Sequence, residues 1–156
     1  MKMEKENKPS EPSFYINFEK VYARNIDSNM SLLNFLRHNH KLTGTKEGCS
    51  EGDCGACSVL IFEENGTLAP INSCILKVGQ ILDKNIVTIE GASKLTSAKP
   101  LIEALNSKAA SQCGFCTPGF VMAALALKEK HKNPSERIIH DSLSGNLCRC
   151  TGYRPI

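Results

Sequence analysis

Eight cysteines in a chain of 156 residues form two groups of four, and this grouping constrains the fold because the members of each group must meet. The first group opens with a C-x4-C-x2-C run, and the second combines C-x2-C with a later C-x-C. These spacings are typical of two separate four-thiolate metal sites. The two groups are Cys49, Cys54, Cys57 and Cys74, then Cys113, Cys116, Cys148 and Cys150.

The cellular compartment decides whether the eight cysteines bind metal or form disulfides. Residues 1–13 are charged and contain proline, which predicts a flexible tail rather than a secretory signal. No apolar run approaches the roughly 18 residues that span a bilayer, so no membrane association is expected. We therefore expect a cytoplasmic protein, where clustered cysteines favour metal over disulfides. Zinc stays open as an alternative, because C-x2-C is also a usual zinc half-site.

Composition narrows the functions that remain. The 19 basic and 16 acidic residues are mixed along the chain and give a formal net charge of +3, with no basic block that would indicate nucleic-acid binding. Neither a serine, histidine and acid constellation nor a glycine-rich nucleotide loop is evident. Substrate chemistry must therefore occur on another chain or domain, and this chain alone is not expected to turn over substrate.

The first cysteine group fits the plant-type arrangement for a [2Fe-2S] cluster, which is C-x4-C-x2-C with a distant fourth cysteine. Gly48, Gly52 and Gly55 surround the first three cysteines. Glycine permits positive φ and close approach, so the loop can turn its backbone N–H groups towards sulfur. The alternative is that these glycines are ordinary turn residues.

A hairpin places the fourth cysteine. Asn65-Gly66 between two apolar runs is a strong signal for a two-residue turn, and the register that follows sets Cys57 opposite Cys74. The expected separation is about 4.5 to 5.5 Å. A bulge near Pro70, which cannot donate to a ladder, would shift this pairing by one residue.

The remaining pattern changes from strand to helix near Gly91. Strands are predicted over residues 14–21 and 86–89, with one helix near 31–38. Three helices are predicted beyond Gly91. The first covers 100–108, the second runs from an N-cap at Thr117 to 131, and the third starts with a cap at Asn133, buries Ile138, Ile139 and Leu143, and ends at Gly145.

The second cysteine group lies at the ends of these helices, in loops that suit an anionic centre. The positive end of the helix from Thr117 would raise the reduction potential of a cluster held there. Arg149, between two cysteines, would act in the same direction unless it is only a solvent-exposed spacer. The C-x2-C and C-x-C spacing by itself does not exclude zinc.

Three motifs surround the cysteines: GTKEGCSEGDCGAC from Gly44, QCGFCTPG from Gln112 and GNLCRCTGY from Gly145. Together they resemble the iron-sulfur part of the xanthine dehydrogenase family of molybdenum hydroxylases. The first motif is most similar to bacterial xanthine dehydrogenases. The resemblance covers residues 14–156 and implies an α+β chain: a plant-ferredoxin-like β-grasp domain over 14–91, then an all-α helical-bundle [2Fe-2S] domain over 92–156.

The resemblance also implies a function. Electrons from a molybdopterin subunit, which hydroxylates a heterocycle or aldehyde, would pass through two [2Fe-2S] clusters to FAD and NAD. The expected partners are a molybdopterin-binding large subunit and an FAD-binding domain or subunit. In this family the second cluster lies nearer the molybdopterin, and the matching positions for pterin contact are Gln112 and Cys150. The substrate is expected to be xanthine, with aldehyde, carbon monoxide and N-heterocycle enzymes as alternatives; a free ferredoxin and a zinc module are disfavoured.

The chain departs from this family at its end. Family members continue past CRCTGYRPI into a further helix, whereas this sequence stops at Ile156. Without that helix, the bundle is expected to expose apolar surface from Phe120 to Leu127 and to be marginally stable alone.

Overall fold

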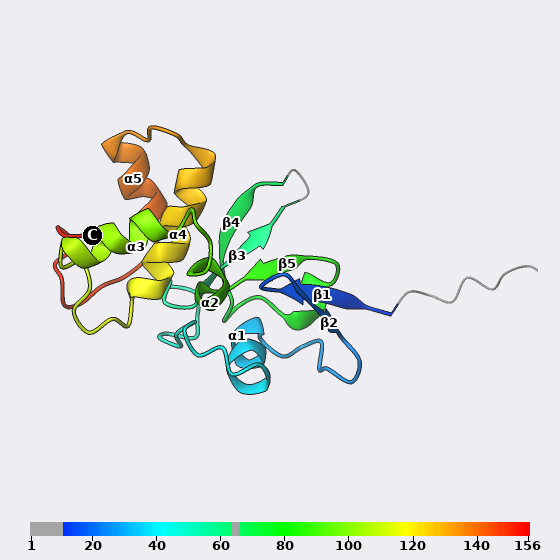
Figure 1. Ribbon diagram of the computed structural model, residues 1–156. Coiled ribbons are helices and arrows are strands. Elements are labelled where there is room, and N and C mark those ends of the chain that lie inside the picture. The colour runs from blue at the N-terminus through cyan, green and yellow to red at the C-terminus, as the bar shows by residue number, and fades with distance from the viewer. Residues whose placement is uncertain (1–10, 64–65) are drawn as a thin grey trace, which may run out of the picture.

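The computed structural model describes residues 11–63 and 66–156, and it has the predicted α+β fold (Figure 1). Five strands form one mixed sheet in the order β2-β1-β5-β3-β4, in which only β1 and β5 are parallel among the described pairs. The strands are β1 (Ser13–Ile16), β2 (Glu19–Tyr22), β3 (Ser58–Phe62), β4 (Leu68–Asn72) and β5 (Asn85–Val87).

The helices fall into two groups in Figure 1, with α1 on one side of the sheet and α3, α4 and α5 together at the other end of the molecule. The helix predicted near 31–38 is present: Ser31 caps it by accepting the Asn34 N–H, and a π-helical turn continues it. The elements are α1 (Leu32–Asn34), the π turn (Phe35–Asn39), a 3-10 turn (Val78–Ile81), α2 (Ile89–Ala92), α3 (Lys99–Ser107), α4 (Thr117–Lys130) and α5 (Glu136–Leu143).

Strands β3 and β5 carry buried residues on both faces of the sheet, and neighbouring residues of a strand point to opposite sides. Val59 and Ile86 belong to a core with α1 and the π turn. Leu60 and Val87, the next residues along the same strands, belong to a second core made with α2, α3 and α4. The strands and the later helices therefore share one hydrophobic core.

Helix α4 contradicts the expected exposure from Phe120 to Leu127. Seven of these eight residues are buried, and Met122 is fully inaccessible. The helix is covered because it packs against β3 and β4 as well as against its neighbouring helices. The prediction was wrong because it considered only a helix bundle and left out the sheet.

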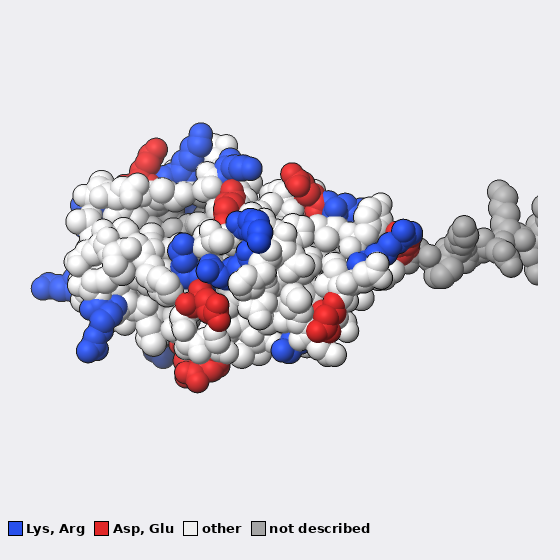
Figure 2. Space-filling view, turned by 90° about the horizontal axis from the view of Figure 1, so that it is seen from below, with Lys and Arg blue, Asp and Glu red and all other residues white. Residues whose placement is uncertain are grey.

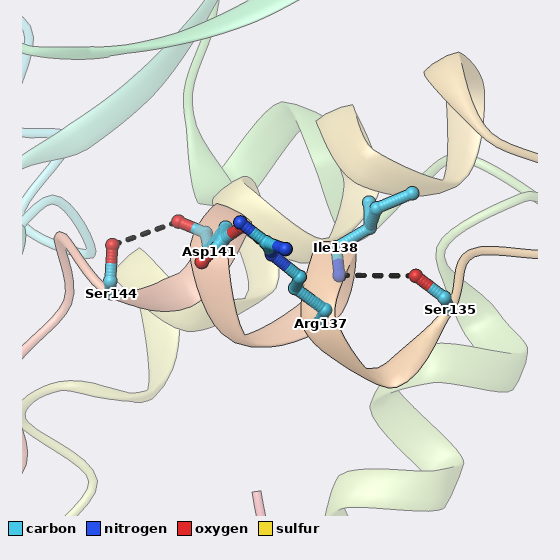
Figure 3. Close-up of polar contacts among 5 residues, drawn as sticks. All are labelled: Ser135, Arg137, Ile138, Asp141 and Ser144. Atoms are coloured by element: carbon cyan, nitrogen blue, oxygen red, sulfur yellow. Dashed lines mark hydrogen bonds and ion pairs between the residues drawn. The ribbon is translucent and has the colours of Figure 1, made fainter.

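Helix α5 is the exposed helix instead, and none of its residues is buried. Ile139 is 37% exposed, while Ile138 and Leu143 are half-buried, so the predicted burial of all three is wrong. Ser135 rather than Asn133 caps the helix, accepting the Ile138 N–H at 3.4 Å (Figure 3). Because Ser135 immediately precedes the helix, its hydroxyl reaches an N–H that Asn133 does not.

The polar face of α5 is visible in Figure 3. The Arg137 guanidinium and the Asp141 carboxylate lie 3.8 Å apart, one turn from each other. The Ser144 hydroxyl donates to the Asp141 carbonyl at 2.8 Å, where the helix ends. Since both charged side chains are well exposed, the ion pair stabilises the helix by only a few tenths of a kcal/mol, about 0.3–0.5.

The register of β3 against β4 differs from the prediction by one residue. Ser58 pairs with Asn72, and the Cys57 carbonyl accepts from the Ser73 N–H at 3.3 Å and the Ser73 hydroxyl at 2.7 Å. Cys57 therefore faces Ser73 rather than Cys74.

The shift begins at the turn and not at Pro70, which pairs with Leu60 inside the ladder. The Glu63 N–H donates to the Thr67 carbonyl at 2.9 Å, so three residues separate the closing pair instead of two. Gly66, the last of the three, has φ +81°, as the left-handed position of a three-residue hairpin requires. Asn65, on which the two-residue prediction rested, lies outside the described residues.

Two element ends also differ from the sequence prediction. The last strand stops at Val87, and Ile89 instead begins the short helix α2. Thr117 is the first residue of α4 rather than its cap, and its hydroxyl donates to Ser111 Oγ at 2.9 Å.

The surface carries charges of both signs. On the face in Figure 2, Lys and Arg side chains are interspersed with Asp and Glu and separated by uncharged surface. Among the described residues, none of the helices combines the length and the apolar character that a membrane crossing requires.

Candidate metal centres

The first cysteine loop turns its backbone N–H groups towards one sulfur, as its glycines predicted. The N–H groups of Glu51, Asp53 and Cys54 donate to Cys49 Sγ at 3.5, 3.3 and 3.4 Å. A Cβ at Gly48 would lie only 2.7 Å from Cys54 Sγ, so a side chain there would displace the sulfur. The loop is therefore shaped around its thiols by backbone atoms.

The four thiols of this loop and the following hairpin meet in two pairs. Cys49 and Cys54 form one pair, in which the Cys49 N–H also donates to Cys54 Sγ at 3.4 Å. Cys57 and Cys74 form the other, with a direct contact between their side chains. The one-residue change of register does not separate this second pair, because Cys74 directly follows the Ser73 that faces Cys57.

The second group of cysteines is also arranged in pairs. Cys113 Sγ and Cys150 Sγ lie 3.2 Å apart, and the Cys116 and Cys148 side chains contact each other. These residues come from the loop before α4 and the loop after α5, so the helices bring together positions far apart in the sequence.

Thr151 and Tyr153 hold the later of these loops. The Thr151 N–H donates to Cys148 Sγ at 3.5 Å, and the Thr151 hydroxyl lies 3.0 Å from the same sulfur. The Cys148 N–H donates to the Tyr153 hydroxyl at 2.9 Å. Tyr153 adopts φ +68°, an unusual conformation for a bulky residue, and its ring packs edge-on against Phe120.

Each site combines an easily ionised thiol with a resistant one. Backbone N–H groups of Glu51 and Cys54 lower the pKa of Cys49 to about 7, whereas burial, with Cys57 adding to it, raises the pKa of Cys74 to about 12. Burial likewise raises the pKa of Cys116 to about 12.

Cys148 corresponds to Cys49 in the second site. Burial opposes its ionisation, but the hydrogen bonds from Thr151 outweigh this and lower the pKa of Cys148 to about 7. Thiolate is the form that binds metal, so part of each site is prepared at neutral pH and the rest must lose protons on binding.

This donor set fits a two-iron cluster. In a [2Fe-2S] centre four thiolates hold two irons, two to each, which corresponds to the two pairs of each site. In the described residues, no three Cys, His, Asp or Glu side chains converge as ligands of a single ion would. The sulfurs meet two by two, and backbone N–H groups point at them.

The two sites are in direct contact through their loops. The Leu147 N–H donates to the Cys54 carbonyl at 2.9 Å, and the Asn146 side-chain amide donates to the Gly55 carbonyl at 3.0 Å. A Cβ at Gly48 would also lie 3.6 Å from the Phe115 ring, which stands between two cysteines of the second site. Both loops of the second site therefore touch the loop of the first.

The sites differ in exposure. Cys113 and Cys150 are exposed, and Gln112 beside them is exposed too, so these three residues share an open edge of the second site. Arg149 is likewise exposed. All eight cysteines stood out in the sequence, whereas Asn146 and Tyr153 were given no role there although both lie in the GNLCRCTGY motif.

The fold and the paired thiols define an iron-sulfur protein with two cluster sites. Two family profiles match it: "2Fe-2S iron-sulfur cluster binding domain" over residues 15–79 and "[2Fe-2S] binding domain" over residues 88–156. Each profile contains one of the two cysteine groups.

Curated relatives extend the match to nearly the whole chain. Aldehyde oxidase 1 of Rattus norvegicus is 44% identical over 154 residues, which are 95% of this chain and 12% of the relative. Xanthine dehydrogenase of Emericella nidulans is 43% identical over 148 residues, 92% of this chain and 11% of the relative. The chain thus spans about an eighth of the length of these relatives.

Solved structures give the same result. A chain of quinoline 2-oxidoreductase from Pseudomonas putida 86 superposes with a TM-score of 0.75 at 36% identity, covering 93% of this chain and 86% of that one. Aldehyde oxidoreductase from Desulfovibrio gigas superposes with a TM-score of 0.81 at 32% identity, covering 93% of this chain and 16% of that one. This protein belongs to the molybdenum hydroxylase family, as its two-cluster iron-sulfur component.

Proposed function

We propose that this chain relays electrons inside a molybdenum-containing hydroxylase, from a molybdopterin site through two [2Fe-2S] clusters to FAD and NAD. The observation that supports this best is the pairing of all eight cysteines in two sites whose loops touch each other. Cys49, Cys54, Cys57 and Cys74 would hold the first cluster. Cys113, Cys116, Cys148 and Cys150 would hold the second. When bound, a cluster of this kind takes up and releases one electron at a time.

The chain's own groups would set the electrostatics of each site. Backbone N–H groups at Cys49 stabilise negative charge on sulfur and so favour the reduced, more negative state. Helix α4 begins at Thr117, directly after Cys116, so its positive end would act in the same direction at the second site.

We further propose that the chain is organised as a plant-ferredoxin-like β-grasp domain over 14–91 and a helical [2Fe-2S] domain over 92–156. The two matching family profiles support a division in this part of the chain, because they are separated between residues 79 and 88. The core shared by β3, β5 and α4 would join the two domains.

The partners follow from the exposed edge of the second site. Gln112 and Cys150 would contact the pterin of a large subunit, and their exposure beside Cys113 supports this role. An FAD-binding domain or subunit would accept the electrons, in the cytoplasm. The matched relatives are about eight times longer than the matched segment, which leaves length for both functions elsewhere.

We propose xanthine as the substrate of the whole enzyme, because the first cysteine motif resembles that of xanthine dehydrogenases. Aldehyde, carbon monoxide and N-heterocycle oxidation are the alternatives. The relatives include enzymes named for aldehyde, xanthine and quinoline at similar identity, so the test must compare these substrates.

The first test is EPR spectroscopy of the anaerobically purified, dithionite-reduced chain, with iron and acid-labile sulfide quantified on the same sample. Two distinct S = 1/2 signals and about four irons per chain support two [2Fe-2S] clusters. A colourless protein loaded with zinc refutes the electron-transfer function.

The second test identifies the assembly. The tagged chain is used to recover its complex, and the complex is analysed for molybdenum, pterin and FAD and assayed with xanthine, an aldehyde and quinoline. Reduction of both clusters by xanthine supports the proposed substrate. If only the aldehyde or only quinoline reduces the clusters, that compound replaces xanthine as the proposed substrate.

A further inference from the structure

One buried side chain, that of Asn146, connects the loop of the first site with the loop after α5 in the second. Asn146 is only 6% exposed, and its amide donates to the Gly55 carbonyl across 91 positions of sequence. Gly55 belongs to the first loop, between Cys54 and Cys57, whereas Asn146 lies two residues before Cys148 of the second. This is a direct side-chain connection between the two sites.

The Gly55 carbonyl is fixed from both sides. It accepts the Ser58 N–H at 3.1 Å and the Ser58 hydroxyl at 2.7 Å from its own loop, in addition to the Asn146 amide. The neighbouring Leu147 N–H donates to the Cys54 carbonyl at 2.9 Å. Two adjacent residues of the second loop thus bind two adjacent carbonyls of the first.

Glycines make this approach possible. Gly55 has φ +68°, and a Cβ there would overlap the Gly145 carbonyl and the Asn146 amide. Gly119, in the first turn of α4, lies on the other side, where a Cβ would overlap the Gly55 carbonyl oxygen and lie 2.9 Å from Asn146 Nδ2. Backbone atoms of Gly55 and Gly119, from the first cysteine loop and α4, therefore lie close to the amide.

We propose that Asn146 is a positioning residue that fixes the separation and relative orientation of the two clusters. This inference rests on the proposed two-cluster function. Electron tunnelling falls exponentially with distance, so an unfixed junction would give a spread of transfer rates. A buried hydrogen bond that joins the two loops would hold a single separation.

The test measures the magnetic interaction between the two reduced clusters, which falls with the cube of their distance. The full chain is reconstituted, its iron is quantified, and the splitting of its low-temperature EPR lines is compared in Asn146→Ala, Gly119→Ala and wild type. Asn72→Ala is the matched control, because Asn72 donates an equivalent amide hydrogen bond at 2.6 Å to Gly52, within the first site only.

We expect Asn146→Ala and Gly119→Ala to retain both clusters and to lose the resolved splitting, and Asn72→Ala to keep the wild-type splitting. Wild-type splitting in an Asn146→Ala chain that contains both clusters overturns the proposal. Loss of the second cluster alone in both variants also overturns it, because Asn146 would then belong to the internal fold of one site. A wild-type chain without iron would refute the proposed function itself.

Discussion

Truncation of Met122 to alanine tests whether the strands and the later helices form one cooperative unit. Met122 is fully buried on α4, in the core that includes Leu60 of β3 and Val87 of β5. Removing a buried methionine side chain leaves a cavity and costs about 2–5 kcal/mol. Since 1.4 kcal/mol corresponds to a factor of ten, amides that exchange by unfolding of this unit should exchange about 30-fold to several thousand-fold faster.

The assay is hydrogen exchange with mass spectrometry on the cluster-loaded chain. We expect peptides from α4 and from β3 (Ser58–Phe62) to lose protection by the same factor, because both depend on opening of the shared core. The control is Ile139→Ala on α5, where the side chain is 37% exposed and the change should stay within about 0.5 kcal/mol. Faster exchange in α4 with wild-type protection in β3 would show that the two parts unfold independently and would refute the shared core.

Three further predictions follow from the cysteine loops and the hairpin. Gly66→Ala should lower the free energy of unfolding by about 1 kcal/mol in chemical denaturation, because φ there is +81°, whereas Gly145→Ala, with open space around its Cβ position, should be neutral. Cys150→Ser should halve the iron content and remove one EPR signal; retention of about four irons would contradict its role as a ligand. In the metal-free chain, alkylation of Cys49 should rise as pH increases through about 7, because thiolate is the reactive form. Cys74, with a pKa raised to about 12, should stay unreactive there, and equal rates for the two would contradict these shifts.

The grouping of the cysteines was predictable because their spacing is a local property of the sequence. The C-x4-C-x2-C run and its glycines predicted a loop with inward N–H groups, and the structure has three such groups at Cys49. The pairing of Cys57 with Cys74 was close but shifted, because turn length sets the register and Gly66 occupies the third position of the turn.

The packing of the helices could not be predicted from the sequence as the cysteine grouping could. The apolar run of α4 predicted a helix correctly, but periodicity does not say what will cover it, and the sheet does so. Asn146 was missed for a similar reason, since its partner Gly55 is 91 residues away and only the folded chain brings them together.

The Asn146–Gly55 contact has a consequence for biosynthesis. On the ribosome, the first cysteine loop emerges before Asn146, which follows Gly55 by 91 positions, so until then the Gly55 carbonyl can bond to Ser58 but not to Asn146. The first site therefore reaches its final shape only when the last segment of the described chain has left the exit tunnel. A cluster inserted before that point would therefore enter a first cysteine loop that still lacks its side-chain contact with the second site.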